Sequence, residues 1–391
     1  MKKLIYTVIA AALLLIAQTG FAQSHQSKTI SWGGETREYL LYVPTNVSAN
    51  APVLFCLHGL GDEMANFANG FDFTAIANQH GWILVTPQAL PFSLGGMMEV
   101  GTAWNAGITV EVPMLGTTAI NGDVDDKGFL LAILDNLIST QSIDQSRVFC
   151  CGFSMGGFMS NRMAIESNRI RAIASINGTI AHPLASQTPT AKVSAMHIHG
   201  DADETVSFND GSFTISLMGM DIELQLGLGA EATVDFWRTK NQCNTTPEEY
   251  NYPDAVADGL TFKRYLYTGG ANNTKTAFIK VTGGEHYVYL QPANDIDYRT
   301  EIYNFFAELP AAIPQTSKQS LAVYPNPAYD KLFIEGSEDI LHIYMYDMQG
   351  RQLTPQINAN GAIDIAGLRQ GVYMLKIETP KGLQITKIVK N

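Results

Sequence analysis

The 391-residue sequence is short of positive charge and of cysteine. Lys and Arg together number 25 against 37 Asp and Glu, which leaves a formal net charge of −12. A nucleic-acid-binding protein would carry a basic face, so this balance argues against that class of partner. The four cysteines are too few for a dense disulfide framework, and no CxxC pair or Cys/His spacing indicates a zinc site.

The cysteines lie mostly in apolar sequence. Cys56, Cys150 and Cys151 fall in runs that are typical of strands, and Cys243 falls in a polar loop. Cys150 and Cys151 are neighbours in one predicted strand, so their side chains should point to opposite faces of a sheet. We expect buried free thiols, with a single bridge as the alternative.

A long apolar run is missing everywhere except at the N-terminus. There two lysines precede the apolar segment 4–17, and Gly20-Phe21-Ala22 supplies small residues for cleavage. This pattern predicts a secretory signal peptide over residues 1–22. The alternative is a membrane anchor, but the run is shorter than the roughly 20 residues that a span needs. We therefore expect an exported protein with no stable membrane span after maturation.

The rest of the chain predicts two domains that differ in their pattern of strands and helices. Over residues 23–310, buried strand-like runs such as VLFCLHG alternate with amphipathic helical segments, which predicts an α/β fold with a mostly parallel sheet flanked by helices. Two long connections, 91–124 and 207–233, are typical of lids or binding loops. Residues 311–319 indicate a linker, and the short alternating strands of 320–391 predict a small all-β sandwich.

One motif between a predicted strand and a predicted helix indicates nucleophilic chemistry. The stretch G-F-S-M-G, residues 152–156, has the form and the context of the G-x-S-x-G nucleophile elbow. The following helix begins at the serine, and its free N–H groups favour negative charge there. The alternative is a tight turn of small residues without chemistry. The sequence predicts that Ser154 is a nucleophile, which then requires a base and an acid elsewhere.

Both partners are found later in the chain. A serine hydroxyl needs a base to take its proton, and His286 follows a predicted strand and a Gly-Gly pair. Asp203, after the predicted strand that ends in H-I-H-G, is the candidate acid that orients this histidine. Asp201 is its rival, although an aspartate there can instead brace a turn. The order Ser154, Asp203, His286 is the α/β-hydrolase order.

The remaining candidate residues would bind the oxyanion and the substrate. We expect the backbone N–H groups of Met155 and Leu60 to stabilise the oxyanion. Trp104 and His58 are candidate substrate contacts, with a core position and a simple turn as their alternatives. The acidic run 123–128 lacks the ligands of a calcium loop and more simply caps a helix, so we expect no metal, and the chemistry needs no cofactor.

Six stretches together resemble a known family. LHGLGD, GWILVTPQA, DDKGFLLAILDNL, IDQSRVFCCGFSMGGFMS, HIHGDADETV and GGEHYVY are similar to the esterase/poly(hydroxyalkanoate) depolymerase family of α/β-hydrolases, which includes feruloyl and acetyl xylan esterases of carbohydrate esterase family 1. The resemblance covers residues 30–307. The family pattern H-G-x-x-D-x-x-V falls on His199 and Asp203, which favours Asp203 over Asp201. The family often has G-G-x-H-x-W-P where this chain has Tyr-Val-Tyr after His286.

The resemblance implies a secreted serine esterase that cleaves feruloyl or acetyl esters on plant polysaccharides. A polyester depolymerase is the alternative within the same chemistry. A non-catalytic surface-binding protein on a hydrolase scaffold is the alternative from another class, and the complete triad argues against it.

The C-terminal segment resembles a second family. The stretches YPNPAYDKLFIEG, IYMYDMQGRQL and GVYMLKIET, within residues 320–391, are similar to the sorting domain of type IX secretion cargo. This resemblance implies the type IX secretion machinery as a partner and a secreted or cell-surface location. A carbohydrate-binding β-sandwich is the competing interpretation.

Overall fold

The computed structural model of the chain divides into two compact units, Met1–Pro310 and Ala311–Asn391. The residues that the structure describes are 24–47, 49–94, 98–112, 116–209, 211–217, 220–309, 322–335, 340, 342–348, 351–353, 356–357, 362–379 and 382–391. The predicted signal peptide, residues 1–22, and the predicted linker, residues 311–319, lie outside them.

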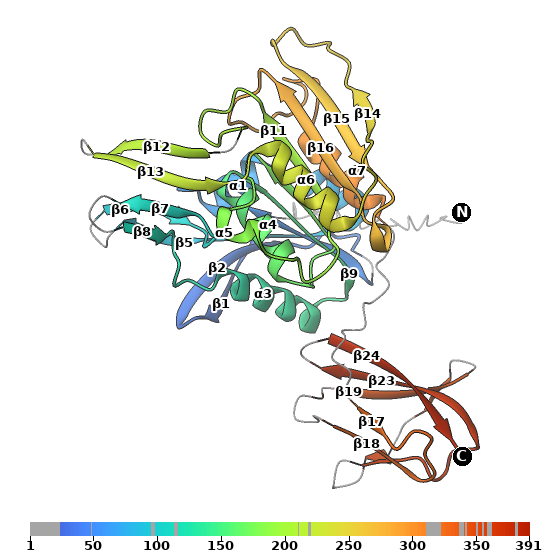
Figure 1. The fold of residues 1–391 in the computed structure, drawn as a ribbon. Coiled ribbons are helices and arrows are strands. Elements are labelled where there is room, and N and C mark those ends of the chain that lie inside the picture. The colour runs from blue at the N-terminus through green and yellow to red at the C-terminus, as the bar shows by residue number, and fades with distance from the viewer. Residues whose placement is uncertain are drawn as a thin grey trace, which may run out of the picture. The chain divides into compact units, whose positions relative to one another are not determined.

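A ten-stranded sheet forms the centre of the first unit (Figure 1). The strands from β4 to β16 in the sheet order are parallel to one another, and antiparallel strands pair on at each edge. In sheet order the strands are β1 (Gln26–Trp32), β2 (Glu35–Tyr42), β4 (Ile83–Pro87), β3 (Ala51–Leu57), β9 (Ile143–Phe153), β10 (Ala172–Ile176), β11 (Ser194–Gly200), β16 (Thr276–Thr282), β15 (Thr261–Tyr267) and β14 (Glu248–Asn251).

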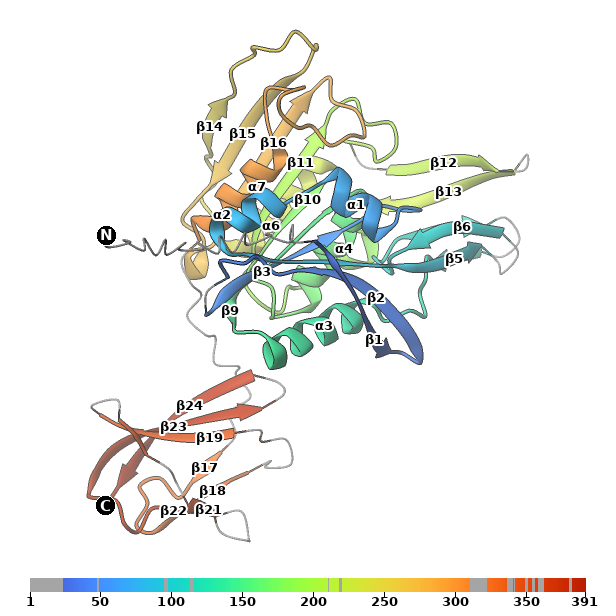
Figure 2. The ribbon, with the colours of Figure 1, turned by 180° about the vertical axis from the view of Figure 1, so that it is seen from behind.

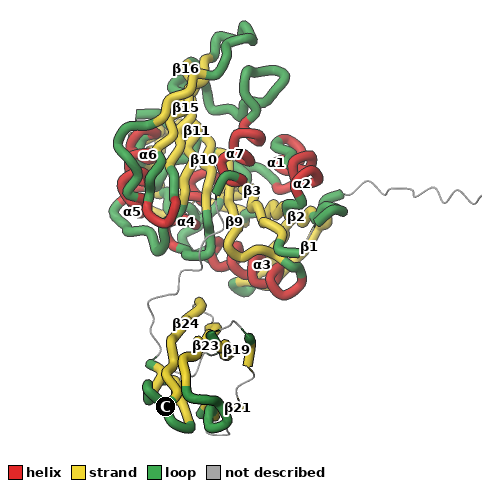
Figure 3. Tube along the Cα trace, turned by 90° about the vertical axis from the view of Figure 1, so that its right-hand side faces the viewer, coloured by secondary structure: helices red, strands yellow, loops and turns green. Residues whose placement is uncertain are grey.

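Helices cover both faces of this sheet (Figures 2 and 3). They are α1 (Met64–Gly70), α2 (Thr74–His80), α3 (Asp126–Thr140), α4 (Met155–Glu166), α5 (His182–Ala185), α6 (Ala230–Asn241) and α7 (Tyr298–Ala307), with a 3₁₀ turn at Ala271–Asn273. Cys150 joins a core cluster that contains residues of α3, α4 and α6, whereas Cys151 joins a second one with residues of α1, α2 and α7. Neighbouring residues of this strand thus pack on opposite faces of the sheet. The predicted α/β fold is confirmed.

The long connections form β-structure. Residues 207–233 contain the hairpin β12 (Gly211–Leu217) and β13 (Met220–Gly227), which shares a four-stranded sheet with β7 (Thr109–Val112) and β8 (Gly116–Ala119). The strands β5 (Leu90–Leu94) and β6 (Met98–Ala103) form a second hairpin, and both hairpins extend outward from the main sheet (Figures 1 and 2). The N–H of Gly61 donates to the carbonyl of Thr102 at 2.8 Å, which ties β6 to the loop after β3.

Two four-stranded sheets make up the second unit. One has the order β17-β18-β22-β21 and the other β20-β19-β23-β24. Buried residues of both sheets, among them Leu332, Met345, Ile363 and Leu375, share one hydrophobic cluster, so the sheets form the predicted sandwich. The strands are β17 (Val323–Tyr324), β18 (Lys331–Ile334), β19 (His342–Asp347), β20 (Gln352–Leu353), β21 (Gln356–Ile357), β22 (Ile363–Asp364), β23 (Gly371–Thr379) and β24 (Gly382–Lys390).

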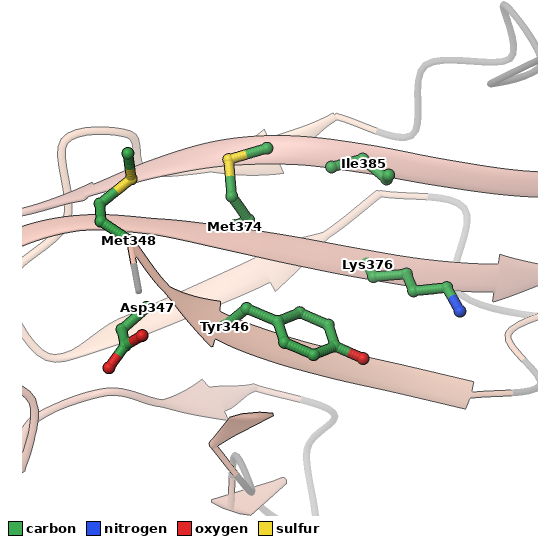
Figure 4. Close-up of a pocket in the computed structure, with 6 residues that line it drawn as sticks. All are labelled: Tyr346, Asp347, Met348, Met374, Lys376 and Ile385. Carbon is green, nitrogen blue, oxygen red and sulfur yellow. The ribbon is translucent and has the colours of Figure 1, made fainter. Parts of the chain in front are cut away.

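The second sheet of this sandwich carries a shallow hollow (Figure 4). It is lined by Tyr346, Asp347, Met348, Met374, Lys376 and Ile385. Met348 and Ile385 are exposed large hydrophobic residues, so this face presents apolar surface to solvent.

The strand order locates a crevice in the main sheet. After β3 the chain adds β4 on one side, and β9 lies on the other side of β3. At such a reversal the connections leave the carboxyl ends of neighbouring strands in opposite directions, and ligands of open α/β sheets bind in the crevice between them. The loop that begins at His58 follows β3, and Ser154 follows β9, so both lie at this point.

Candidate active site

Ser154 occupies a sharp turn between β9 and α4. Its backbone angles, φ 53° and ψ −123°, lie outside the regions that residues with a side chain normally adopt. Its N–H donates to the carbonyl of Ile176 at 2.8 Å, and its own carbonyl accepts from Gly157 and Phe158 at the start of the helix. Strain of this kind persists only where the surroundings hold it, and it is the expected geometry of a nucleophile elbow.

Glycines make this turn sterically possible. A Cβ on Gly152 would overlap the backbone of Gly156, and a Cβ on Gly156 would overlap the carbonyl of Leu57 at the end of β3. A Cβ on Gly178, after β10, would overlap the carbonyl of Ser154 itself. The backbone segments therefore approach each other closely around Ser154, and larger residues would force them apart.

His286 and Asp203 meet at the same edge of the sheet. Nδ1 of His286 lies 2.7 Å from Oδ2 of Asp203, a side chain that is fully buried. The imidazole keeps 17% of its surface exposed and packs against Phe153, whose ring centroid lies 4.8 Å away. Since Phe153 directly precedes Ser154, the histidine lies beside the nucleophile turn. Asp203 can fix the histidine tautomer in which Nε2 is free to accept a proton.

Asp203 is held by several donors. Oδ1 accepts from the N–H groups of Thr205 and Val206, both at 2.8 Å. Oδ2 also accepts from Nδ2 of Asn177 at 2.5 Å and lies 3.4 Å from Nε2 of His199. Burial by itself would raise the pKa of Asp203. The hydrogen bonds from His199, His286 and Asn177 and the charge of His286 outweigh it, so the pKa of this carboxyl is lowered and Asp203 stays ionised.

Asp201, the rival acid, has a different place. Its Oδ1 accepts from the N–H of Gly283 at 2.8 Å, in the turn that leads to His286. Nζ of Lys280 lies 3.9 Å from its carboxylate. Asp201 therefore braces the turn, and Asp203 is the carboxylate that reaches the imidazole.

The two expected oxyanion donors belong to segments that adjoin Ser154. Met155 is the first residue of α4, where N–H groups have no partner within the helix. Leu60 follows Gly59, and a Cβ on Gly59 would lie 3.4 Å from Cβ of Ser154, so this loop passes directly beside the serine. The tie of Gly61 to Thr102 holds the loop from its other side.

His58 lies beneath this loop and is fully buried. Burial lowers the pKa of His58 more than its contact with Gly59 and the nearby acidic residues raise it, so the ring is neutral. Its Nε2 accepts from the N–H of Ala89 at 3.1 Å, which places the proton on Nδ1. Nδ1–H donates to the carbonyl of Gly59 at 2.8 Å. Because that carbonyl and the Leu60 N–H belong to one planar trans peptide, His58 also sets the direction of the N–H.

Trp104 and His58 differ from the sequence expectation in their exposure. The sequence predicts that both are candidate substrate contacts, but neither side chain has any exposed surface. Nε1 of Trp104 donates to the carbonyl of His58 at 2.9 Å, and the two rings pack at a centroid distance of 5.0 Å. Both residues hold the loop after β3, because Trp104 donates to the carbonyl of His58 and His58 donates to the carbonyl of Gly59.

Sequence reasoning missed Asn177, which follows β10. Its amide donates to Asp203 and to the carbonyl of Glu285, so it links the acid to the segment that carries His286. Asn177 has φ 48°, a conformation in which asparagine is enriched among residues other than glycine. The only sequence signal is an asparagine before a glycine at the end of a buried strand, which is more often a simple turn.

Each of the two units contains a match to a known protein family. Residues 42–218 match the family described as phospholipase/carboxylesterase, and residues 322–391 match the secretion system C-terminal sorting domain. Within the described residues no helix has the length and apolar character needed to cross a bilayer.

Several curated proteins are similar to the first unit. A putative esterase, NocK, from Nocardia uniformis subsp. tsuyamanensis is 26% identical over 69% of this chain and 74% of its own length. Feruloyl esterase B from Neurospora crassa is 28% identical over 45% of this chain, which spans 57% of that enzyme. A bifunctional acetylxylan esterase/xylanase from Neocallimastix patriciarum is 27% identical over 45% of this chain, and only 22% of that longer protein is matched.

Proposed function

We propose that this chain, an α/β-hydrolase of the phospholipase/carboxylesterase family with a C-terminal secretion sorting domain, is a serine esterase that acts outside the cell on feruloyl or acetyl esters of plant polysaccharides. The sorting domain indicates a secreted or cell-surface protein, and the match to the phospholipase/carboxylesterase family supports ester hydrolysis. The 2.7 Å contact between His286 and Asp203, beside the strained turn at Ser154, carries the proposal for the mechanism.

In this mechanism Ser154 attacks the ester carbonyl. Nε2 of His286 takes the hydroxyl proton and later gives it to the leaving alcohol, while Asp203 stabilises the imidazolium. The N–H groups of Met155 and Leu60 bind the oxyanion of the tetrahedral intermediate. Water then repeats the cycle on the acyl-enzyme, and no cofactor takes part in these steps.

The substrate class rests on the similar enzymes and on the surface that flanks the site. Two of the similar proteins are a feruloyl esterase and a bifunctional acetylxylan esterase/xylanase. Leu60, a proposed oxyanion donor, is 41% exposed. Tyr287, which follows His286 in the chain, is 62% exposed. Phe153 adds a half-buried ring next to His286. Apolar and aromatic surface of this kind favours an ester with an aromatic acid.

The specificity constant tests both parts of the proposal. We would measure kcat/KM of the full chain on methyl ferulate, p-nitrophenyl acetate and p-nitrophenyl butyrate, with Ser154→Ala as the control. A strong preference for ferulate supports the aromatic acyl site, and a preference for acetate points to acetyl esters. Hydrolysis that survives in Ser154→Ala would contradict the serine mechanism, and activity toward none of these esters would contradict the substrate class.

A further inference from the structure

A line of buried polar side chains lies behind Asp203. Oγ of Ser175 in β10 lies 2.8 Å from Nδ1 of His197 in β11. Nε2 of His197 lies 3.0 Å from Nδ1 of His199, whose Nε2 lies 2.9 Å from the carbonyl of Val206 and 3.4 Å from Oδ2 of Asp203. Ser175, His197 and His199 expose 2% of their surface or less. The proposed mechanism uses none of them, and we refer to them as the histidine chain.

The acceptors determine where each proton lies. A carbonyl oxygen only accepts, so Nε2 of His199 carries a proton and donates toward Val206 and Asp203. With one proton on each ring, Nδ1 of His199 is bare, so the proton between the two rings belongs to His197 Nε2. His197 Nδ1 is bare in turn and accepts from the hydroxyl of Ser175. Burial lowers the pKa of His197 well below its ordinary value, which agrees with a neutral ring.

All three donors therefore point the same way. Each hydrogen bond polarises the next. The last donor, Nε2 of His199, lies 2.9 Å from the Val206 carbonyl and 3.4 Å from Oδ2, the oxygen that also accepts from His286. A donor on this oxygen draws negative charge toward itself, which leaves less charge to stabilise a protonated His286. The effect on the base depends on the direction of the chain.

We propose that Ser175, His197 and His199 are positioning residues that hold Oδ2 of Asp203 and limit the basicity of His286. This inference rests on the proposed function, because it gives Asp203 and His286 their roles in ester hydrolysis. Its consequence is that the acid limb of the pH profile lies at lower pH than the Asp203–His286 pair alone would set.

The surroundings of the chain contain few competing charges. Lys280 in β16 has its ammonium group 4.7 Å from the ring centre of Phe208 and 3.9 Å from the carboxylates of both Asp201 and Glu231. The rings of Phe208 and Phe278 pack against His199 and His197. Other titratable residues in the described part of the chain include Glu204, next to Asp203, Glu285, next to His286, and Tyr289, whose hydroxyl accepts from the N–H of Glu285.

Substitution of His199 tests the proposal in the full chain. His199→Phe removes the donor to Asp203 at a similar ring size, whereas His199→Gln retains an N–H group at the position of Nε2. We expect His199→Phe to move the acid limb of kcat/KM upward by about half a pH unit and to lower kcat/KM about tenfold, since a hydrogen bond to a charged group is lost. His199→Gln should restore the limb position. His80→Gln, an exposed histidine stacked on Tyr303, is the matched control and should change neither quantity.

A spectroscopic measurement separates this inference from the proposed function. The pKa of His286 in the free protein can be followed by NMR of labelled histidine without any substrate. We expect it to rise in His199→Phe and to rise by about 0.2 units in Ser175→Ala, which loses only the far end of the chain.

The possible results distinguish failure of the proposed function from failure of the role proposed for the histidine chain. If wild type hydrolyses no ester, the proposed function fails, and the NMR titration still decides the role of the chain. If His199→Phe does not fold, the Ser175→Ala titration takes its place. An unchanged His286 pKa in the folded variant, or a His199→Gln variant that behaves like His199→Phe, would overturn the proposal and leave the chain a purely structural role.

Discussion

The carboxylate of Asp203 and the imidazole of His286 lie 2.7 Å apart although 83 positions separate them in the chain. Parallel pairing of β11 with β16 brings them together, because both residues follow the carboxyl ends of these neighbouring strands. Backbone hydrogen bonds also join the two strand ends: the N–H of Asp201 donates to the carbonyl of Val281, and the N–H of Ala202 donates to the carbonyl of Gly284. The geometry of the pair is thus set by the sheet.

Replacement of Asp203 by asparagine should leave the fold and remove most of the activity. An amide at this position favours the wrong tautomer of His286, and the analogous change in a known serine protease lowers kcat about 10⁴-fold. We expect a loss of similar order in kcat on p-nitrophenyl acetate. A loss of less than tenfold would contradict the role of Asp203.

The same carboxyl should make stability depend on pH in a defined direction. The folded pKa of Asp203 is lowered relative to an unfolded value of about 3.9, so its contribution is present above about pH 4 and is lost as pH falls through the folded pKa. The difference in unfolding free energy between wild type and Asp203→Asn should therefore shrink below about pH 4. Urea unfolding at a series of pH values measures it, and a difference that grows toward low pH would contradict this sign.

A methyl group on Gly156 should disrupt the nucleophile turn. The new Cβ would overlap the carbonyl of Leu57, and neither backbone can move without displacing a central strand. We expect Gly156→Ala to cost about 3 kcal/mol or more of unfolding free energy. Gly70→Ala is the matched control, since nothing lies within 4 Å of its Cβ position. Thermal unfolding of both variants decides between a local clash and a general intolerance of alanine.

Loss of His58 should impair the oxyanion site without changing substrate affinity. His58→Ala releases the Gly59 carbonyl, so the Leu60 N–H is no longer aimed at the reaction centre. Removal of one oxyanion donor costs about 10²–10³-fold in kcat in a known case, and we expect the lower part of that range with KM little changed. His58→Asn keeps an N–H near Nδ1 and should retain more activity. A rise in KM alone would instead favour a substrate contact for His58.

The cysteines should be present as unreactive thiols. Cys56, Cys150, Cys151 and Cys243 are free and buried in the structure. Cys56 and Cys151 are neighbours across β3 and β9, with sulfurs 3.8 Å apart, and burial raises the pKa of Cys150 to about 12. We expect no reaction of the folded protein with a thiol reagent at pH 8 and four reactive thiols after unfolding without reductant. Two thiols after unfolding would reveal a bridge.

Removal of the C-terminal unit should separate catalysis from export. Residues 311–391 form a unit with its own hydrophobic cluster, so residues 23–310 should fold and hydrolyse esters without them. We expect unchanged kcat/KM for the shortened chain and its retention inside a host that exports the full chain. A reporter fused to 311–391 is the control for export, and inactivity of the shortened chain would contradict independent folding.

Much of the architecture follows from local sequence pattern. The apolar runs around Cys56 and Cys150 specify buried strands, because a strand covered on both faces needs apolar residues at successive positions. The glycines around Ser154 indicate the nucleophile turn, since only they leave room for the crossing backbone. Residue type and order alone thus indicate Ser154 and His286, with Asp203 as the candidate acid and Asp201 as its rival.

Tertiary structure decided what each side chain contacts. The sequence makes Trp104 and His58 candidate substrate contacts, because each has an aromatic ring with a polar N–H near the predicted site. In the folded chain both side chains are completely buried. The choice between Asp201 and Asp203 depends on which carboxylate the β16 turn reaches. The direction of the histidine chain depends on the carbonyl of Val206, in the loop that follows the strand carrying His197 and His199. These outcomes arise from strand register and from hydrogen-bond partners on other segments of the chain, and the pattern of residue types along the sequence does not specify them.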